Sequence, residues 1–293
     1  MNLVLTVLEI TAPVFLLAAI GFIWVRMGFD YQIDFVTRMA MTLSVPCLIF
    51  TALMKTDIDP SALTALSLAA VGAYGALTLV TALVMWGLKL EMRSYLSPLI
   101  FGNTGNLGLP LALFAFGEAG LSYAVVVFAV MAVWNFTFGV WIVSGGGSVV
   151  RALKEPLLWA TILGGVFLSQ GWHTPLFLTN TLELVGQLAI PLMLITLGVA
   201  VARLRPGSIR LASALSVLKV VLCVAISWII GRAFGLDDVA FAVLVLQIST
   251  PVAVTSYLLA VKYGADADAV AGLVVVSTLL SVLLLPALLA VLL

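Results

Sequence analysis

The chain has 293 residues, of which 63% are hydrophobic and only 9% are charged, and its formal net charge is zero. A soluble domain usually has about 45–50% apolar and about 25% charged residues, so this much apolar surface requires the bilayer as its solvent. The balanced charge offers no basic face for nucleic acid, and neither of the two cysteines has the spacing of metal ligands. We therefore expect an all-α polytopic membrane protein that has no metal or organic cofactor and is not an enzyme.

The predicted elements are membrane-spanning helices, each of which needs about 20 mostly apolar residues. The first apolar run has no Lys or Arg before it, so we interpret it as a span and not as a signal peptide. Reading between charged and turn-rich stretches predicts ten spans joined by short loops. The predicted spans are 3–25, 35–54, 61–88, 94–116, 119–143, 155–171, 177–202, 208–233, 239–263 and 267–292.

The basic residues predict the orientation of these spans, because cytoplasmic loops are enriched in Lys and Arg. Only Lys55 and Arg232 follow even-numbered spans, and Lys219 lies inside the eighth span. We therefore expect the odd-numbered loops in the cytoplasm and both termini outside, in the periplasm, for a protein of the cell's inner membrane. The bases after odd-numbered spans are Arg26, Arg38, Lys89, Arg93, Arg151, Lys154, Arg203, Arg205, Arg210 and Lys262.

The glycine-rich segment 143–148 predicts a hinge between two sets of five spans, residues 1–147 and 148–293. Because five is odd, the second set must cross the membrane in the opposite sense, which is the inverted repeat of many secondary transporters. Short internal likenesses support the repeat. Residues 43–49 and 188–194 share a central proline, and residues 116–120 resemble residues 263–267.

The fourth and ninth spans contain residues that interrupt helices. Residues 101–110 carry three glycines, two asparagines and a proline, and residues 247–256 carry one proline among hydroxyl residues, which predicts a milder break. Freed backbone groups in lipid need protein or water partners, so paired breaks in two halves predict a substrate site near the midplane. The predicted substrate-binding residues are Asn103, Thr104, Gly105, Asn106, Gly108, Pro110, Gln247, Ser249, Thr250 and Pro251.

Two ionisable residues inside the predicted spans are candidates for a charge partner or for ion coupling. Lys219 lies about ten residues into the eighth span, where it could pair with a substrate carboxylate, change protonation, or face a hydrated crevice or an internal acid. Glu9 lies about two turns into the first span and is either a coupling residue or a solvated residue at the outer face. Coupling to H⁺ or Na⁺ therefore stays open.

The run from Gly102 to Leu111 resembles the fourth-span motif of the auxin efflux carrier family, as do Pro46, the pair Pro191 and Gly198, and residues 263–266. The resemblance covers essentially the whole chain. It implies two five-helix repeats whose fourth and ninth spans cross at broken centres, with a mobile part that moves against a scaffold. It also implies small organic anion substrates, namely auxin-like acids in plants and dicarboxylates such as malate or malonate in bacteria. Plant-type carriers have an asparagine beside the ninth-span proline, whereas Ser249 and Thr250 precede Pro251 here.

The function that we expect is alternating-access transport of small organic anions. A sodium-coupled symporter of the bile-acid type and a non-transporting receptor on the same scaffold are the alternatives. The breaks lack the acidic side chains of many sodium sites, and solute flux separates a carrier from a receptor. The expected partners are the substrate, the lipid bilayer and, as a further option, a second copy of the chain in a homodimer.

Overall fold

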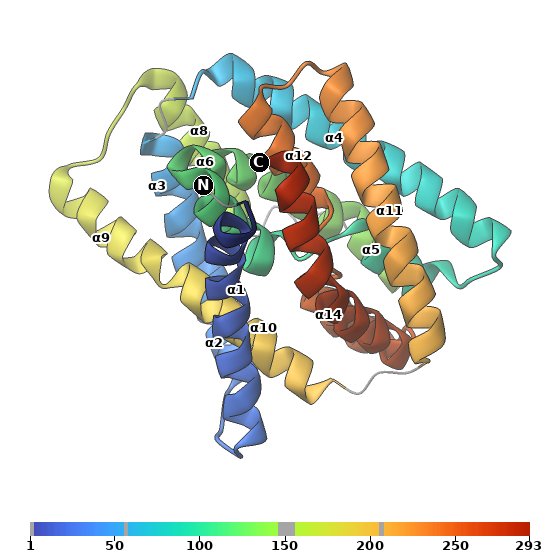
Figure 1. Ribbon diagram of the computed structural model, residues 1–293. Coiled ribbons are helices and arrows are strands. Elements are labelled where there is room, and N and C mark those ends of the chain that lie inside the picture. Colours follow the sequence, from blue (N-terminus) through green and yellow to red (C-terminus); the bar gives the residue numbers. More distant parts are fainter. Residues whose placement is uncertain (1–2, 56–57, 146–155, 205–207) are drawn as a thin grey trace.

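The computed structural model describes residues 3–55, 58–145, 156–204 and 208–293, and in this part of the chain the secondary structure is helical (Figure 1). Seven of the described helical segments are long and apolar enough to cross a membrane. The elements are α1 (Leu3–Arg26), α2 (Ile33–Met39), η1 (Ala40–Ser44), α3 (Val45–Lys55), α4 (Pro60–Gly87), α5 (Met92–Ile100), η2 (Thr104–Gly108), α6 (Leu109–Trp134), η3 (Asn135–Gly139), α7 (Val140–Ser144), α8 (Pro156–Gln170), α9 (Leu176–Gln187), α10 (Ala189–Arg203), α11 (Ile209–Ala233), α12 (Asp238–Ile248), α13 (Val254–Tyr263) and α14 (Ala267–Leu292).

Polar residues at the ends of the apolar runs set where the helices begin and stop. The carboxylates of Asp59, Asp237 and Asp266 accept hydrogen bonds from free backbone N–H groups in the first turns of α4, α12 and α14. Gly145 and Gly264 end α7 and α13 in the left-handed conformation, which glycine adopts without strain. The three π-helical turns η1, η2 and η3 each continue directly into an α-helix.

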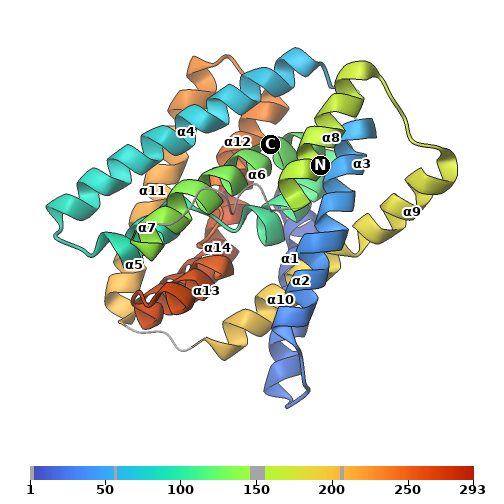
Figure 2. The same cartoon turned by 180° about the vertical axis from the view of Figure 1, so that it is seen from behind.

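The helices form two groups, most of whose members lie on opposite sides of the molecule in Figures 1 and 2, with α6 between them. The first helix group comprises α1, α2, η1, α3, α8, α9 and α10. In it α1 packs along α10, and α3 packs along α8 and α9. Glycines allow these helices to approach closely, because a Cβ at Gly198 would overlap the carbonyl oxygen of Ala18, and one at Gly21 would overlap that of Ile195. The second helix group comprises the remaining elements, among which α4, α12 and α14 each contact α11.

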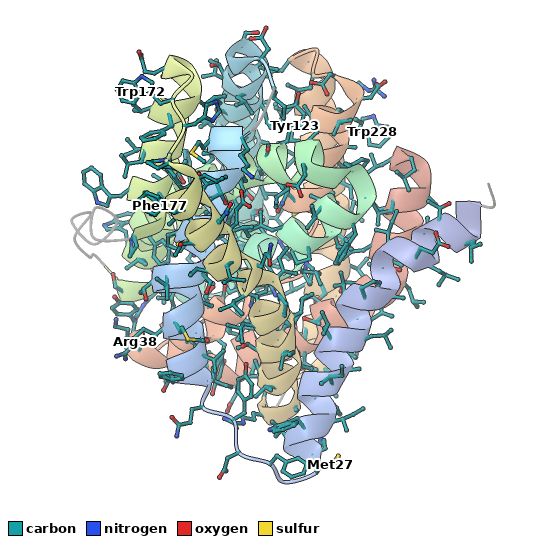
Figure 3. All side chains as sticks on the ribbon, turned by 90° about the vertical axis from the view of Figure 1, so that its left-hand side faces the viewer. Met27, Arg38, Tyr123, Trp172, Phe177 and Trp228 are labelled. Atoms are coloured by element: carbon teal, nitrogen blue, oxygen red, sulfur yellow. The ribbon has the colours of Figure 1, made fainter. Side chains whose placement is uncertain are left out.

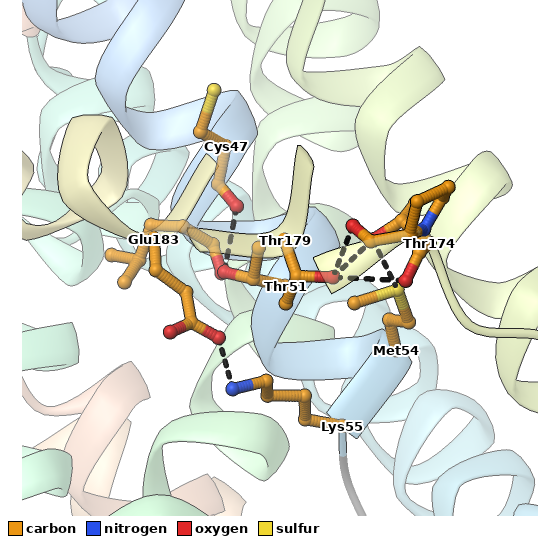
Figure 4. Close-up of polar contacts among 9 residues, drawn as sticks. Cys47, Thr51, Met54, Lys55, Thr174, Thr179 and Glu183 are labelled. Atoms are coloured by element: carbon orange, nitrogen blue, oxygen red, sulfur yellow. Dashed lines mark hydrogen bonds and ion pairs between the residues drawn. The ribbon is translucent and has the colours of Figure 1, made fainter. Parts of the chain in front are cut away.

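Polar contacts fasten the first helix group at both of its ends. At one end, Lys55 of α3 forms an ion pair with Glu183 of α9 (Figure 4). At the other end, the hydroxyl group of Tyr31 lies 2.7 Å from that of Thr196 in α10, and the Arg203 guanidinium donates to the Tyr31 carbonyl oxygen at 2.7 Å. These contacts hold the loop between α1 and α2 against α10.

Two details differ from the predicted boundaries or lie beyond what the structure describes. The predicted loop between the fourth and fifth spans is a single sharp turn at Gly117, whose φ of 66° and ψ of −156° break the direction of α6. A residue with a Cβ would be strained at this φ. The predicted boundary between the halves, at residues 147 and 148, lies outside the described residues.

Candidate functional site

The first interruption in the predicted fourth span is shorter than the sequence indicates. Helix α5 ends at Ile100, residues 101–103 are not helical, and η2 begins at Thr104 and continues into α6. The expectation that the break extends to Pro110 is therefore corrected, because Pro110 lies in the first turn of α6. Helices η2 and α6 form one continuous helix, and Pro110 follows the π-helical turn of η2, where the α-helical hydrogen-bond pattern is locally changed without ending the helix.

The second interruption separates α12, which ends at Ile248, from α13, which begins at Val254. Residues 249–253 lie outside both helices, so the expectation of a milder break at Pro251 is also corrected. Thr250 contributes to this break, because its hydroxyl group donates to the carbonyl oxygen of Gln247 at 2.7 Å and closes the end of α12. The Thr250 hydroxyl group therefore already donates its proton to a partner within the protein.

The two interruptions meet through their backbones. Gly102 and Val252 form an isolated antiparallel bridge, and the Asn103 N–H donates to the Pro251 carbonyl oxygen at 2.7 Å. Gly102 is required for this approach, because a Cβ there would overlap the hydroxyl group of Thr250. We call residues 101–108 and 247–254 the crossing.

Buried polar side chains gather at the crossing. The amide nitrogen of Asn103, the hydroxyl groups of Thr104 and Ser249, and both amide atoms of Gln247 are buried without a hydrogen-bond partner in the described structure. The Gln247 amide lies against Gly108, where a Cβ would overlap its Oε1. Most buried polar side chains in proteins are hydrogen-bonded, so this cluster is a candidate binding site.

The backbone of the crossing adds donors to these side chains. Asn103 and Ala253 precede the first turns of η2 and α13, where N–H groups have no partner within the helix and carry partial positive charge. The ends of α5 and α12 present carbonyl groups with partial negative charge instead. Neither stretch of the crossing contains an acidic residue. The arrangement can bind an anion through neutral donors.

The other predicted site residues take different positions. Gly105 packs against Phe128, and Asn106 is only half-buried. Lys219 is buried to 1% exposure and donates to the Leu99 carbonyl oxygen at 3.3 Å, at the end of α5. Glu9 is exposed on α1.

The structure adds polar residues that sequence reasoning missed. The Ser277 hydroxyl group of α14 accepts from the Val252 N–H at 3.0 Å and holds the second interruption in place. The Ser97 hydroxyl group lies beside Gly139, close to Phe101 and to the side-chain Oδ1 of Asn135, a residue whose depth in the fifth span already made it a candidate for a helix contact or a substrate contact. No spacing in the sequence distinguishes Ser277 or Ser97 from the many other serines of the apolar helices.

A separate cavity of about 700 Å³ opens between the α1–α2 loop, the end of α10 and α13, and none of the predicted site residues lines it. Burial beside α10 raises the pKa of Tyr31 in this loop, although its hydrogen bond to Thr196 acts in the opposite direction. Among the described residues, no group of three His, Cys, Asp or Glu side chains is arranged to bind a metal. The cavity is lined by Asp30, Tyr31, Gln32, Ile33, Asp34, Phe35, Arg203 and Leu258.

A helical membrane protein with interrupted helices that meet at a buried polar site has the architecture of a membrane transporter. The chain belongs to the membrane transport protein family, that of the auxin efflux carriers, whose pattern matches residues 6–149 and again residues 145–289. It is similar to an uncharacterised transporter of Methanothermobacter thermautotrophicus, with 29% identity over 95% of this chain and 96% of that protein. An uncharacterised transporter of Methanocaldococcus jannaschii is 26% identical over 63% of each chain.

Proposed function

We propose that this protein is a secondary transporter that moves small organic anions across the cell's inner membrane by alternating access around the crossing. One observation carries the proposal, namely the hydrogen bond from the Asn103 N–H to the Pro251 carbonyl oxygen. This bond joins the two interruptions and brings unpartnered polar side chains from both of them into one buried place.

The chemistry of the crossing favours carboxylates as substrates. The side-chain donors of Asn103 and Thr104 lie at the N-terminal end of η2, which favours anions, and those of Gln247 and Ser249 come from the end of α12 across the crossing. A carboxylate has two acceptor oxygens that several such donors can share, and the crossing has no acidic side chain to repel it. Auxin-like acids and dicarboxylates both meet this requirement.

The proposed topology has ten spans in two inverted halves, residues 1–147 and 148–293. Seven helical segments are long enough by themselves. Helix α8 is an eighth span, and α12 together with α13 forms a ninth. The long segment 104–144 divides at Gly117 into two spans, the first of which also includes α5, and this brings the number to ten. The contact of α1 with α10 then corresponds to that of α8 with α3, as a repeat of five spans requires.

The positions of two equivalent loops support the inversion. In this topology Met27 lies between the first and second spans, and Trp172 lies between the sixth and seventh. Figure 3 shows them at opposite ends of the molecule. Together with the basic loops, this arrangement supports a cytoplasmic α1–α2 loop and periplasmic termini.

The two helix groups supply the parts for alternating access. The crossing belongs to the second group, while the first group is fastened internally by the Lys55–Glu183 pair and by the Tyr31 and Arg203 contacts. We propose that the second group moves against the first and exposes the crossing to one side at a time.

The proposal is tested by carboxylate uptake into proteoliposomes that contain the full-length protein. A panel of mono- and dicarboxylates is expected to include one that shows saturable uptake, and Asn103→Ala is expected to reduce this uptake at least tenfold. Asn180→Ala, on the exposed face of α9, is the matched control and leaves uptake unchanged. Absence of saturable uptake for every anion, with binding retained, would indicate a receptor instead.

A further inference from the structure

The C-terminal end of α5 lies inside the protein at the first interruption. The last carbonyl groups of a helix have no partner within it and carry partial negative charge. The Phe101 N–H satisfies the Ser97 carbonyl oxygen at 2.9 Å, and the Leu99 carbonyl oxygen accepts from the Lys219 ammonium at 3.3 Å. A positive side chain from α11 therefore faces the negative end of α5.

Lys219 has no carboxylate partner in the described part of the chain. Its ammonium group contacts the Leu99 carbonyl oxygen and, at 3.7 Å, the sulfur atom of Cys223, which is also completely buried. Neither contact comes from the side chains of Asn103, Thr104, Gln247 or Ser249. Buried charges in proteins are normally paired, so the end of α5 is the compensation that this structure provides for Lys219.

The equivalent end of α12 is closed without a charge. There the Gln247 carbonyl oxygen accepts from the Thr250 hydroxyl group at 2.7 Å and from the Thr250 N–H at 3.4 Å. The two interrupted helices thus end differently. A buried ammonium group faces the end of α5, and a neutral hydroxyl group closes the end of α12.

Carbonyl ends of interrupted helices are where transporters coordinate coupling cations. We propose that the Lys219 ammonium is a resident cation at the end of α5 and takes the place of a coupling Na⁺. Anion binding at the crossing then requires no Na⁺, because the positive charge that compensates the carbonyl groups at the end of α5 belongs to a side chain of the protein. This inference rests on the proposed function for the identity of the substrate, but the occupancy of the α5 end can be measured without any substrate.

The test compares thermal unfolding of the purified full-length protein in sodium chloride and in choline chloride at equal concentration, with Na⁺ itself as the probe. The wild type is expected to unfold at the same temperature in both salts. Lys219→Met keeps much of the side-chain volume but removes the charge, and we expect it to unfold at a lower temperature and to gain a stabilisation that saturates with sodium chloride. Lys219→Arg restores a cation and is expected to show no response to Na⁺.

A saturable stabilisation of the wild type by Na⁺ overturns the proposal, and so does a Lys219→Met variant that does not respond to Na⁺. If Lys219→Met does not fold, Lys219→Gln replaces it in the same measurement. A saturable stabilisation of Lys219→Gln by Na⁺, with no such effect on the wild type, is then the expected result, and its absence overturns the proposal. Lys89→Gln, which removes an exposed lysine, is the control and should behave as the wild type. A wild type that binds no carboxylate, and whose unfolding temperature does not depend on Na⁺, would contradict the proposed function but not the proposal that Lys219 replaces Na⁺.

Discussion

The Asn103 N–H and the Pro251 carbonyl oxygen, separated by 2.7 Å, join two helices that are far apart in the sequence. Each partner belongs to an interruption and would lack a backbone partner alone. In the bilayer an unpaired backbone group costs several kcal/mol, so the two interruptions satisfy each other. The bond also fixes how closely the polar side chains on both sides approach.

Gly102→Ala is expected to abolish carboxylate uptake without preventing folding. The added Cβ would overlap the hydroxyl group of Thr250 and push the two interruptions apart. Gly75→Ala is the matched control, because a Cβ at this position in α4 meets no atom within 4 Å. Alanine in place of a helical glycine should stabilise the control by roughly 0.5–1 kcal/mol. Wild-type uptake by the Gly102 variant would show that the close backbone approach is dispensable.

Gln247→Met is expected to stabilise the protein while weakening anion binding. Both amide atoms of Gln247 are buried without a partner, and leaving a buried polar group unpaired costs about 1–3 kcal/mol. Methionine has a similar length and no such cost. Unfolding temperature and carboxylate affinity, measured on the same preparation, should therefore change in opposite directions. An unchanged affinity would remove Gln247 from the binding site.

Arg93→Lys is expected to destabilise the second helix group by about 1.5–3 kcal/mol, the range for hydrogen bonds to charged groups. The Arg93 guanidinium donates to the Val143 carbonyl oxygen at the end of α7 and to that of Tyr263 at the end of α13. A lysine ammonium lacks the planar fork that reaches both carbonyl groups. Chemical unfolding measures the loss, and a variant as stable as the wild type would contradict this account.

Tyr31→Phe is expected to lower stability by about 0.5–1.5 kcal/mol at neutral pH, because it removes the hydrogen bond to Thr196. Burial raises the pKa of Tyr31 above its ordinary value of 10.0, so folding favours the neutral phenol. This contribution is complete below the pKa of the unfolded chain and is lost as the pH rises through the pKa of the folded protein. The difference between wild type and variant should narrow at alkaline pH, and a difference that widens would be inconsistent with this assignment.

The sequence predicts the helical membrane architecture and the place of both interruptions, because apolar length and helix-breaking residues are local properties. Gly102 and Pro251 mark the breaks directly. The extent of each break depends on context, since Pro110 lies within the continuous helix that η2 and α6 form, while Ser249 and Thr250 follow the end of α12. No single-span pattern reveals that the Gln247 side chain lies against Gly108, because that contact forms only when the two helices cross.

Lys219 illustrates what sequence leaves open about a charge. Its depth in an apolar run indicates an unusual environment, but a substrate carboxylate, a proton and an internal partner are equally compatible with that depth. The structure shows the Leu99 carbonyl oxygen as its partner, and this oxygen is free to accept from Lys219 only because α5 ends at Ile100. Ser277 is a similar case, because its hydroxyl group matters only through the Val252 N–H of a distant interruption.

The most direct test of the central claim measures protection of a thiol at the crossing by the transported carboxylate. In a protein that carries Cys47→Ala, the variant Ser249→Cys is treated with a small alkylating reagent with and without the anion. Bound carboxylate is predicted to slow alkylation at position 249 with a saturable dependence on its concentration. It should leave the exposed control Ser169→Cys unaffected. Equal alkylation rates at position 249 with and without a saturating, transported carboxylate would contradict binding at the crossing.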